Sequence, residues 1–176
     1  MVMRNPLPYQ GSRLAAWYGA DPVWRGPMEA RAFREFQGQI TRHVAADSLT
    51  YSIPEFGIPG GPKGVSITIR FDRYGQPRHF GLPARDMPTV TCRPEVASPH
   101  RNPDGSMCLW FPADPPDKRW QSEQGLDCLV GIVANHLFAE YHWAKTGGHN
   151  GGEWLLDEAC HGFPEEERHA RRNRRR

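Results

Sequence analysis

The stretch Val65-Ser66-Ile67-Thr68-Ile69-Arg70-Phe71 is the clearest β-strand pattern in the chain. Apolar and polar residues alternate along it, so one face of the strand is apolar and the other is polar. Antiparallel sheets commonly have this character, with one face on the core and the other in water. The stretch therefore predicts a sheet whose apolar face is covered by another element.

Further strand patterns flank this one. Residues 49–53 (Leu-Thr-Tyr-Ser-Ile) alternate in the same way and predict the preceding strand. The segment from Asp72 to Pro77 is typical of a hairpin connection. Shorter strands are expected near residues 78–82 and 88–92. Together these segments predict an antiparallel meander of three or four strands.

Two helices are expected, one before the meander and one after it. Phe33, Phe36, Ile40 and Val44 recur at steps of three or four residues, which predicts a helix from about residue 27 to 46. Pro27 suits its first position. The second helix has Ser122 as candidate N-cap and ends at Gly147-Gly148. Its apolar face, which should pack on the sheet, comprises Leu126, Leu129, Val130, Val133, Leu137 and Tyr141.

Between the meander and the second helix, residues 91–120 show no sustained period and are rich in proline. Proline lacks a backbone donor, so a long irregular segment is expected here, and such segments are often functional. The fold class is therefore α+β: an N-terminal helix, a four-stranded antiparallel meander, an irregular active-site loop and a central helix. We expect a single domain over residues 1–163 and a basic tail over 164–176.

Bulk composition indicates a soluble globular protein. The chain has 176 residues, 24% of them charged, and a formal net charge of +2. No window approaches the ~18 apolar residues that span a bilayer, and the N-terminus lacks the apolar segment of a signal peptide. A cytoplasmic protein without membrane partners is the default. The six arginines of residues 168–176 form a basic run, whose simplest interpretation is a solvated tail.

The four cysteines show no C-x-x-C spacing, which argues against a disulfide framework and a zinc ribbon. Cys92, at the end of an expected strand, and Cys128, within a helix, are interpreted as packing residues. Glu158 and His161 could lie on one helical face, but a lone E-x-x-H is a weak metal signal. We expect no metal site and no cofactor.

Cys108 differs from the other cysteines because a polar, Gly/Pro-rich run surrounds it. That run is His100-Arg101-Asn102-Pro103-Asp104-Gly105-Ser106-Met107-Cys108-Leu109-Trp110. A thiol on such a loop indicates a nucleophile more than a core residue. Acyl transfer also requires donors for the developing oxyanion and a rigid surround. His100 and Asn102 offer donors, while Trp110 and Trp120 can anchor the loop.

At this point the chain resembles the ubiquitin-conjugating enzymes. Their signature is His-Pro-Asn, then Gly-x-Ile-Cys-Leu, then a Trp about a dozen residues on. This chain has His100-Arg101-Asn102, then Gly105-Ser106-Met107-Cys108-Leu109, then Trp120. The resemblance covers roughly residues 27–142 and implies that family's fold, with Cys108 as the residue that carries a thioester.

The resemblance is closer to the bacterial branch of this family. Those proteins carry His-Arg-x-x-Asp-Gly-x-x-Cys-Leu, which residues 100–109 match, and Thr-Gly-Glu-Trp-Leu-x-x-Glu-x-x-His, which residues 153–161 match after Thr146-Gly147 and a short insertion. Such proteins belong to antiphage operons of the CBASS type. The resemblance implies conjugation of a cGAS-like nucleotidyltransferase, or a ubiquitin-like protein, through its C-terminus. A separate activating enzyme is a further possible partner.

Two departures from the family pattern shape the expected site. Arg101 replaces the proline of His-Pro-Asn, and His100, not Asn102, lies eight residues before Cys108, where the family has its asparagine. We therefore expect His100 to stabilise the oxyanion, with Asn102 as the alternative. Asp104 and Asp114 are near in sequence, but nothing selects either as the acid that helps deprotonate an attacking amine.

Two other functions remain open. A non-catalytic member of the same fold could hold a ubiquitin-like or nucleotidyltransferase partner, although the cysteine disfavours this. A nucleic-acid-binding accessory protein could work through the arginine tail, which is the less favoured alternative.

Overall fold

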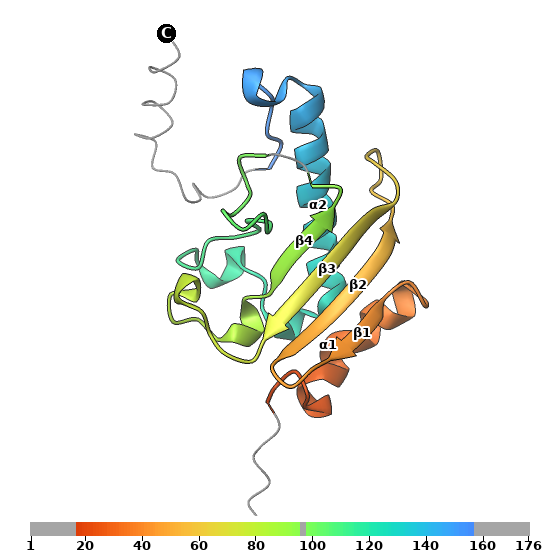
Figure 1. Ribbon diagram of the computed structural model, residues 1–176, viewed down its shortest axis with the longest axis vertical. Helices are drawn as coiled ribbons and strands as arrows, with labels where there is room; N and C mark the ends of the chain where they lie inside the picture. The colour runs from red at the N-terminus through yellow and green to blue at the C-terminus, as the bar shows by residue number, and fades with distance from the viewer. Residues whose placement is uncertain (1–16, 96–97, 157–176) are drawn as a thin grey trace, which may run out of the picture.

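The computed structural model describes residues 17–95 and 98–156 (Figure 1). These residues form a mixed α/β structure with two α-helices and one four-stranded antiparallel sheet. The main elements are α1 (Pro22–Glu35), β1 (Thr41–Val44), β2 (Ser48–Phe56), β3 (Val65–Asp72), β4 (Thr89–Arg93) and α2 (Leu126–Lys145). The sheet is a meander with the order β1-β2-β3-β4. This is the order of elements that the resemblance implies.

The alternation in β3 sets the two faces of the sheet. Val65, Ile67, Ile69 and Phe71 are buried, whereas the residues between them are at least partly exposed. Tyr51 and Ile53 of β2 lie opposite Ile69 and Ile67 and are also buried. Cross-strand apolar pairs of this kind stabilise a sheet and fix its register.

Helix α2 covers the apolar face, as the sequence predicts. Both helices lie on the same side of the sheet, and within the described residues no α-helix covers the opposite side (Figure 1). Five buried apolar side chains of α2 belong to the same hydrophobic cluster as those of β2 and β3, namely Leu126, Leu129, Val130, Val133 and Leu137. The predicted face is confirmed at Leu126, Leu129, Val130, Val133 and Leu137, while Tyr141 is only half-buried.

The first helix differs from the prediction at both ends. Pro22, not Pro27, is near the start, where the Asp21 side chain accepts the Val23 N–H at 2.9 Å. The helix ends at Glu35, and Gly38 follows with a φ of +73°. The expected stripe to Val44 is wrong beyond this point, because residues 41–44 pair with β2 as an edge strand. The spacing of apolar residues along this segment carries no information about its pairing with β2.

Two smaller predictions are also corrected. The segment expected as a strand near 78–82 is a 3₁₀ turn (Pro77–His79) followed by Phe80 in the left-handed region. Ser122 does not cap α2, since Gly125 takes the N-cap position and Ser122 donates its N–H and hydroxyl to Asp86. The expected strand near 88–92 is confirmed as β4, and α2 ends close to Gly147.

The irregular segment before α2 is confirmed within the described residues. After β4 it contains short 3₁₀ turns at Pro116–Lys118 and Ser122–Gln124 and one isolated bridge between Arg101 and Met107. Cys160, Glu158, His161, the arginine tail and the boundary at residue 163 lie outside the described residues. Among the helices that are described, none has the length and apolar character of a membrane span.

Candidate active site

Cys108 lies on a small hairpin between β4 and α2. The Asn102 N–H donates to the Ser106 carbonyl at 2.8 Å, and the Cys108 N–H donates to the His100 carbonyl at 2.9 Å. Arg101 and Met107 form the bridge between these two pairs. His100 therefore lies directly opposite Cys108, and Asn102 lies opposite Ser106. These backbone bonds make the loop a fixed platform for the sulfur.

Gly105 allows the hairpin to turn. Its φ is +80°, which side-chain-bearing residues rarely adopt. A Cβ built there would lie 2.3 Å from Oε1 of Glu95. The turn is further held by Asp104, whose Oδ1 accepts the Ser106 N–H at 3.0 Å. The sequence places a glycine at this position because no other residue fits without strain.

One face of the hairpin packs against the core, and the other face carries Cys108. Side chains alternate across a strand, so Arg101 and Met107 share one face and His100, Asn102, Ser106 and Cys108 share the other. Met107 is buried in the core, and its N–H donates to the Val90 carbonyl of β4 at 2.8 Å. One face thus fastens the hairpin, and the other presents Cys108.

A buried ion pair locks the hairpin to α2. Nε and Nη2 of Arg101 each donate to one carboxylate oxygen of Glu140, both at 2.6 Å, and the two side chains are 8% and 0% exposed. Arg101 also donates to the Gly105 carbonyl at 3.0 Å and to Sγ of Cys92 at 3.1 Å. Arg101 stands where the resemblance has proline, and it holds the loop by ionic contacts instead of a rigid ring.

Glu140 remains ionised in this environment. Burial raises its pKa, but hydrogen bonds from His136, Arg101 and Ser98 outweigh burial and lower the pKa to about 2. Ser98 donates its hydroxyl to Glu140 at 2.6 Å, and His136 Nε2 lies 3.5 Å from the same carboxylate oxygen. Cys92 is buried in the core, as predicted for a packing residue, and burial raises the pKa of its thiol, with Arg101 opposing.

His100 is held by an aromatic neighbour. Its ring stacks on Trp154 with centroids 4.1 Å apart and an interplanar angle of 17°. Trp154 follows Glu153, whose N–H donates to the Thr146 hydroxyl at 2.8 Å and whose carboxylate lies 3.2 Å from His142 Nε2. The segment after α2 is thereby tied to the helix end and covers His100.

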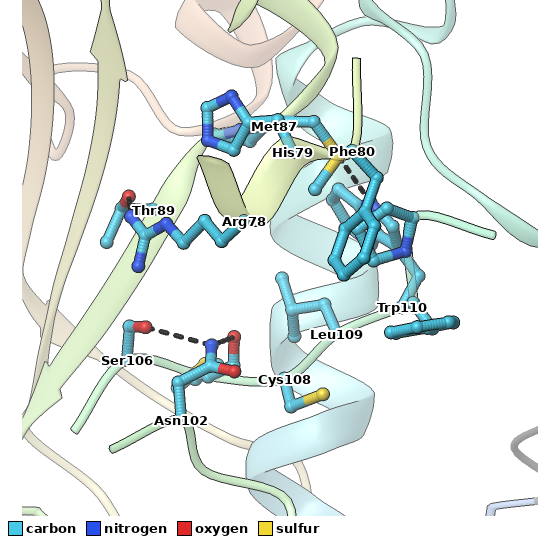
Figure 2. A pocket seen from close by; sticks show the side chains of 14 residues that line it. Arg78, His79, Phe80, Met87, Thr89, Asn102, Ser106, Cys108, Leu109 and Trp110 are labelled. Atoms are coloured by element: carbon cyan, nitrogen blue, oxygen red, sulfur yellow. Dashed lines mark hydrogen bonds between the residues drawn. The ribbon is translucent and has the colours of Figure 1, made fainter. Parts of the chain in front are cut away.

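Cys108 is half-buried and lines a pocket of about 160 Å³. Figure 2 shows that polar side chains line one side of the pocket and apolar, mainly aromatic, side chains line the other. The polar wall comprises Arg78, Thr89, Asn102 and Ser106, and the aromatic wall comprises Phe80, Leu109, Trp110 and Phe111. The Cys108 side chain lies at the edge of the pocket between these walls (Figure 2).

The three predicted site residues lie on one hairpin, and two of them line the pocket. Cys108 and Asn102 line the pocket, whereas His100 does not, because its ring packs on Trp154. The Asn102 amide donates to the Ser106 hydroxyl at 3.0 Å and to the Met107 carbonyl at 3.3 Å. Asn102 therefore supports the turn with its own N–H groups.

Both nearby acids make contacts within the loop. Asp104 is paired with Arg78 at 2.6 Å and accepts from Ser106; burial raises its pKa, but these bonds outweigh burial and lower it. Asp114 accepts the Phe111 N–H at 2.9 Å. These contacts hold the loop on both sides of Cys108.

Sequence reasoning missed Glu140 and the aromatic wall. Glu140 was detectable, because a carboxylate next to Ala139 and one turn after Leu137 falls close to the apolar face of a helix. Phe80 was assigned to a strand, so its place in the pocket could not be expected. Within residues 17–95 and 98–156, no group of three or more His, Cys, Asp or Glu side chains could hold a metal ion.

Comparison with known proteins adds little to this geometry. No protein-family model matches the chain. No curated protein matches it either. Among solved structures, the chain is similar to human ubiquitin-conjugating enzyme E2 G1, with 15% identity, a TM-score of 0.43, and coverage of 66% of this chain and 92% of that chain. A likeness of this size supports no conclusion about activity.

Proposed function

We propose that this protein is a cysteine acyl transferase of the ubiquitin-conjugating type, with Cys108 as the nucleophile. The observation that carries the proposal is the position of Cys108: a half-buried thiol at the edge of a pocket, on a hairpin fixed by backbone bonds and a buried ion pair. A nucleophile needs access and rigid placement together, and a packing cysteine needs neither.

The reaction has two balanced steps. The Cys108 thiolate attacks the activated C-terminal carbonyl of a donor protein, forming a thioester and expelling the carrier thiol, which takes up the proton. A target amine then attacks the thioester carbonyl, the C–S bond breaks, and Cys108 leaves as thiolate or thiol once the amine has lost its proton. The product is an amide.

His100 is the proposed oxyanion-stabilising residue. It lies directly opposite Cys108 in the hairpin, and directly opposed residues have Cβ atoms about 4.5–5.5 Å apart. Asn102 lies one pair further along, and its amide N–H groups already donate to Ser106 and Met107. Asn102 is assigned the role of holding the turn.

The donor class follows from the resemblance of residues 100–109 to the bacterial branch. We propose that the donor is the C-terminus of a cGAS-like nucleotidyltransferase, or of a ubiquitin-like protein, in an antiphage operon, loaded by a separate activating enzyme. The test is co-expression with the products of neighbouring genes. A covalent adduct should form that disappears with reducing agent and is absent in Cys108→Ala.

The matched control is Cys128→Ala, which removes a half-buried thiol on α2 outside the pocket and should leave the adduct intact. Cys108→Ser should convert the thioester into an ester that resists reducing agent. If the Cys108→Ala protein keeps full function in cells and still binds its partner, the protein is the non-catalytic binding module instead.

A further inference from the structure

The aromatic wall of the pocket has no role in the proposed chemistry of Cys108. One of its residues, Phe80, nevertheless has an unfavourable backbone conformation. Phe80 is 68% exposed and has a φ of +50°, although it has a side chain. This left-handed conformation is unfavourable for residues other than glycine, and such outliers often mark functional positions. The Phe80 N–H donates to the Pro77 carbonyl, which holds the residue there.

Phe80 is also paired with a second ring from a distant part of the chain. Its ring centroid lies 5.6 Å from that of Phe111, at an interplanar angle of 60°. This edge-on arrangement is a favoured aromatic geometry. Two segments on either side of β4 in the sequence thus build one apolar surface beside Cys108. Rigid aromatic surfaces of this kind are typical of positions that bind a partner side chain.

The polar wall, in contrast, is already satisfied by its own contacts. Arg78 donates to Asp104 and to the Thr89 hydroxyl, and Ser106 links Asp104 to Asn102. A polar ligand would have to break these bonds, so it gains little. Trp110 Nε1 is likewise directed at Met87 Sδ, at 3.4 Å. The larger share of the pocket surface that remains accessible to a ligand is apolar.

We propose that the aromatic wall is a subsite for a large apolar side chain of the donor, located immediately before a C-terminal glycine whose carbonyl is transferred to Cys108. This inference rests on the proposed function, since the donor is the protein whose C-terminus is transferred to Cys108. The pocket volume of about 160 Å³ is close to that of a roughly 150 Å³ protein cavity that binds benzene, so it can take one aromatic ring. One extended residue spans about 3.3–3.6 Å, so the penultimate residue stays beside the pocket.

The subsite can be tested with small probes that need no activating enzyme. The probes are N-acetyl-X-Gly thioesters of mercaptoethanesulfonate, with X as Phe, Leu, Ala or Asp. Acylation of Cys108, with release of the free mercaptan, is followed by intact-protein mass spectrometry. The Phe and Leu probes should react about tenfold faster than the Ala and Asp probes, the discrimination expected of an apolar pocket.

Variants locate this preference on the protein. Phe80→Ala and Phe111→Ala should bring the ratio of Phe to Ala rates close to one. Tyr74→Ala is the matched control, because Tyr74 is 67% exposed on the same segment and does not line the pocket. That variant should keep the ratio. Equal rates for all four probes on the unmodified protein overturn the subsite and leave the acyl transferase intact.

A second measurement separates the subsite from the chemistry. Binding of N-acetyl-Phe-Gly amide to the Cys108→Ala protein is followed by NMR, with the Trp110 indole as reporter. Saturable binding that Phe80→Ala weakens supports the subsite, even if no thioester probe acylates Cys108 and the proposed function fails. If no thioester probe acylates Cys108 and the amide does not bind, the subsite is overturned.

Discussion

Arg101 and Glu140 form a two-pronged ion pair that joins the Cys108 hairpin to α2, with both bonds at 2.6 Å and both side chains out of water. Removing one partner leaves an uncompensated buried charge, which typically costs about 3–5 kcal/mol of folding free energy. We expect Arg101→Met to lower the free energy of unfolding by this amount in urea titrations.

The double variant Arg101→Met/Glu140→Leu should recover much of that loss, because no charge is then buried alone. The control is Glu35→Ala, which removes a solvent-exposed pair with Arg31 on α1 and should leave the urea midpoint nearly unchanged. An additive loss in the double variant would show that the ion pair does not couple the two elements.

The low pKa of Glu140 predicts a defined acid sensitivity. Its pKa is about 2 in the folded protein against 4.5 ordinarily, because hydrogen bonds from His136, Arg101 and Ser98 outweigh burial. A depressed pKa contributes stability above the unfolded pKa and loses it as pH falls through the folded value. We expect about 3 kcal/mol, present above pH 5, to disappear between roughly pH 4.5 and 2.

Glu140→Gln has no carboxylate to titrate, so its unfolding free energy should be lower at neutral pH and depend less on pH in this window. Urea titrations of both proteins at several pH values provide the measurement. Parallel pH profiles for the two proteins would contradict a depressed Glu140 pKa.

The roles of His100 and Asn102 can be separated by rate and stability. His100→Ala should slow acylation of Cys108 about 100-fold, as expected for loss of an oxyanion donor. Asn102→Ala should mainly reduce stability, because its amide bonds to Ser106 and Met107 hold the turn. Single-turnover acylation and urea titration together give both quantities. If only Asn102→Ala is slow, the assignment of His100 is wrong.

Trp154 should act through His100, on which it stacks at 4.1 Å. We expect Trp154→Ala to slow acylation roughly tenfold by freeing the His100 ring, and Trp154→Phe to restore most of the rate. The decisive measurement is a double-mutant cycle. His100→Ala/Trp154→Ala should be no slower than His100→Ala alone, whereas additive losses would assign Trp154 a separate role.

Two glycines provide opposite predictions. Gly105→Ala forces a side chain into the left-handed region and against Glu95, so it should lower the free energy of unfolding by about 1–2 kcal/mol or more. Gly131→Ala lies in α2 with no atom within 4 Å of the added Cβ, so it should raise stability by up to ~1 kcal/mol. Thermal unfolding of both variants checks the contrast.

Local patterns in the sequence predicted the elements with strong periodicity. β3 and the buried face of α2 were identified because each repeats its apolar residues over several positions at one period. β1 was misassigned because Ile40 and Val44 happen to continue the helical spacing of Phe33 and Phe36. Pairing with β2, which no local period records, decides its structure.

By itself, the sequence determined the meander, the central helix, the proline-rich segment between them and the thiol at Cys108. Each of these features depends on residues that are close together along the chain. Only the tertiary structure decided what surrounds that thiol. Glu140 meets Arg101 from 39 positions away, and Phe80 meets Phe111 across β4. Contacts between distant segments depend on how the sheet and helix pack, and no local pattern encodes that packing.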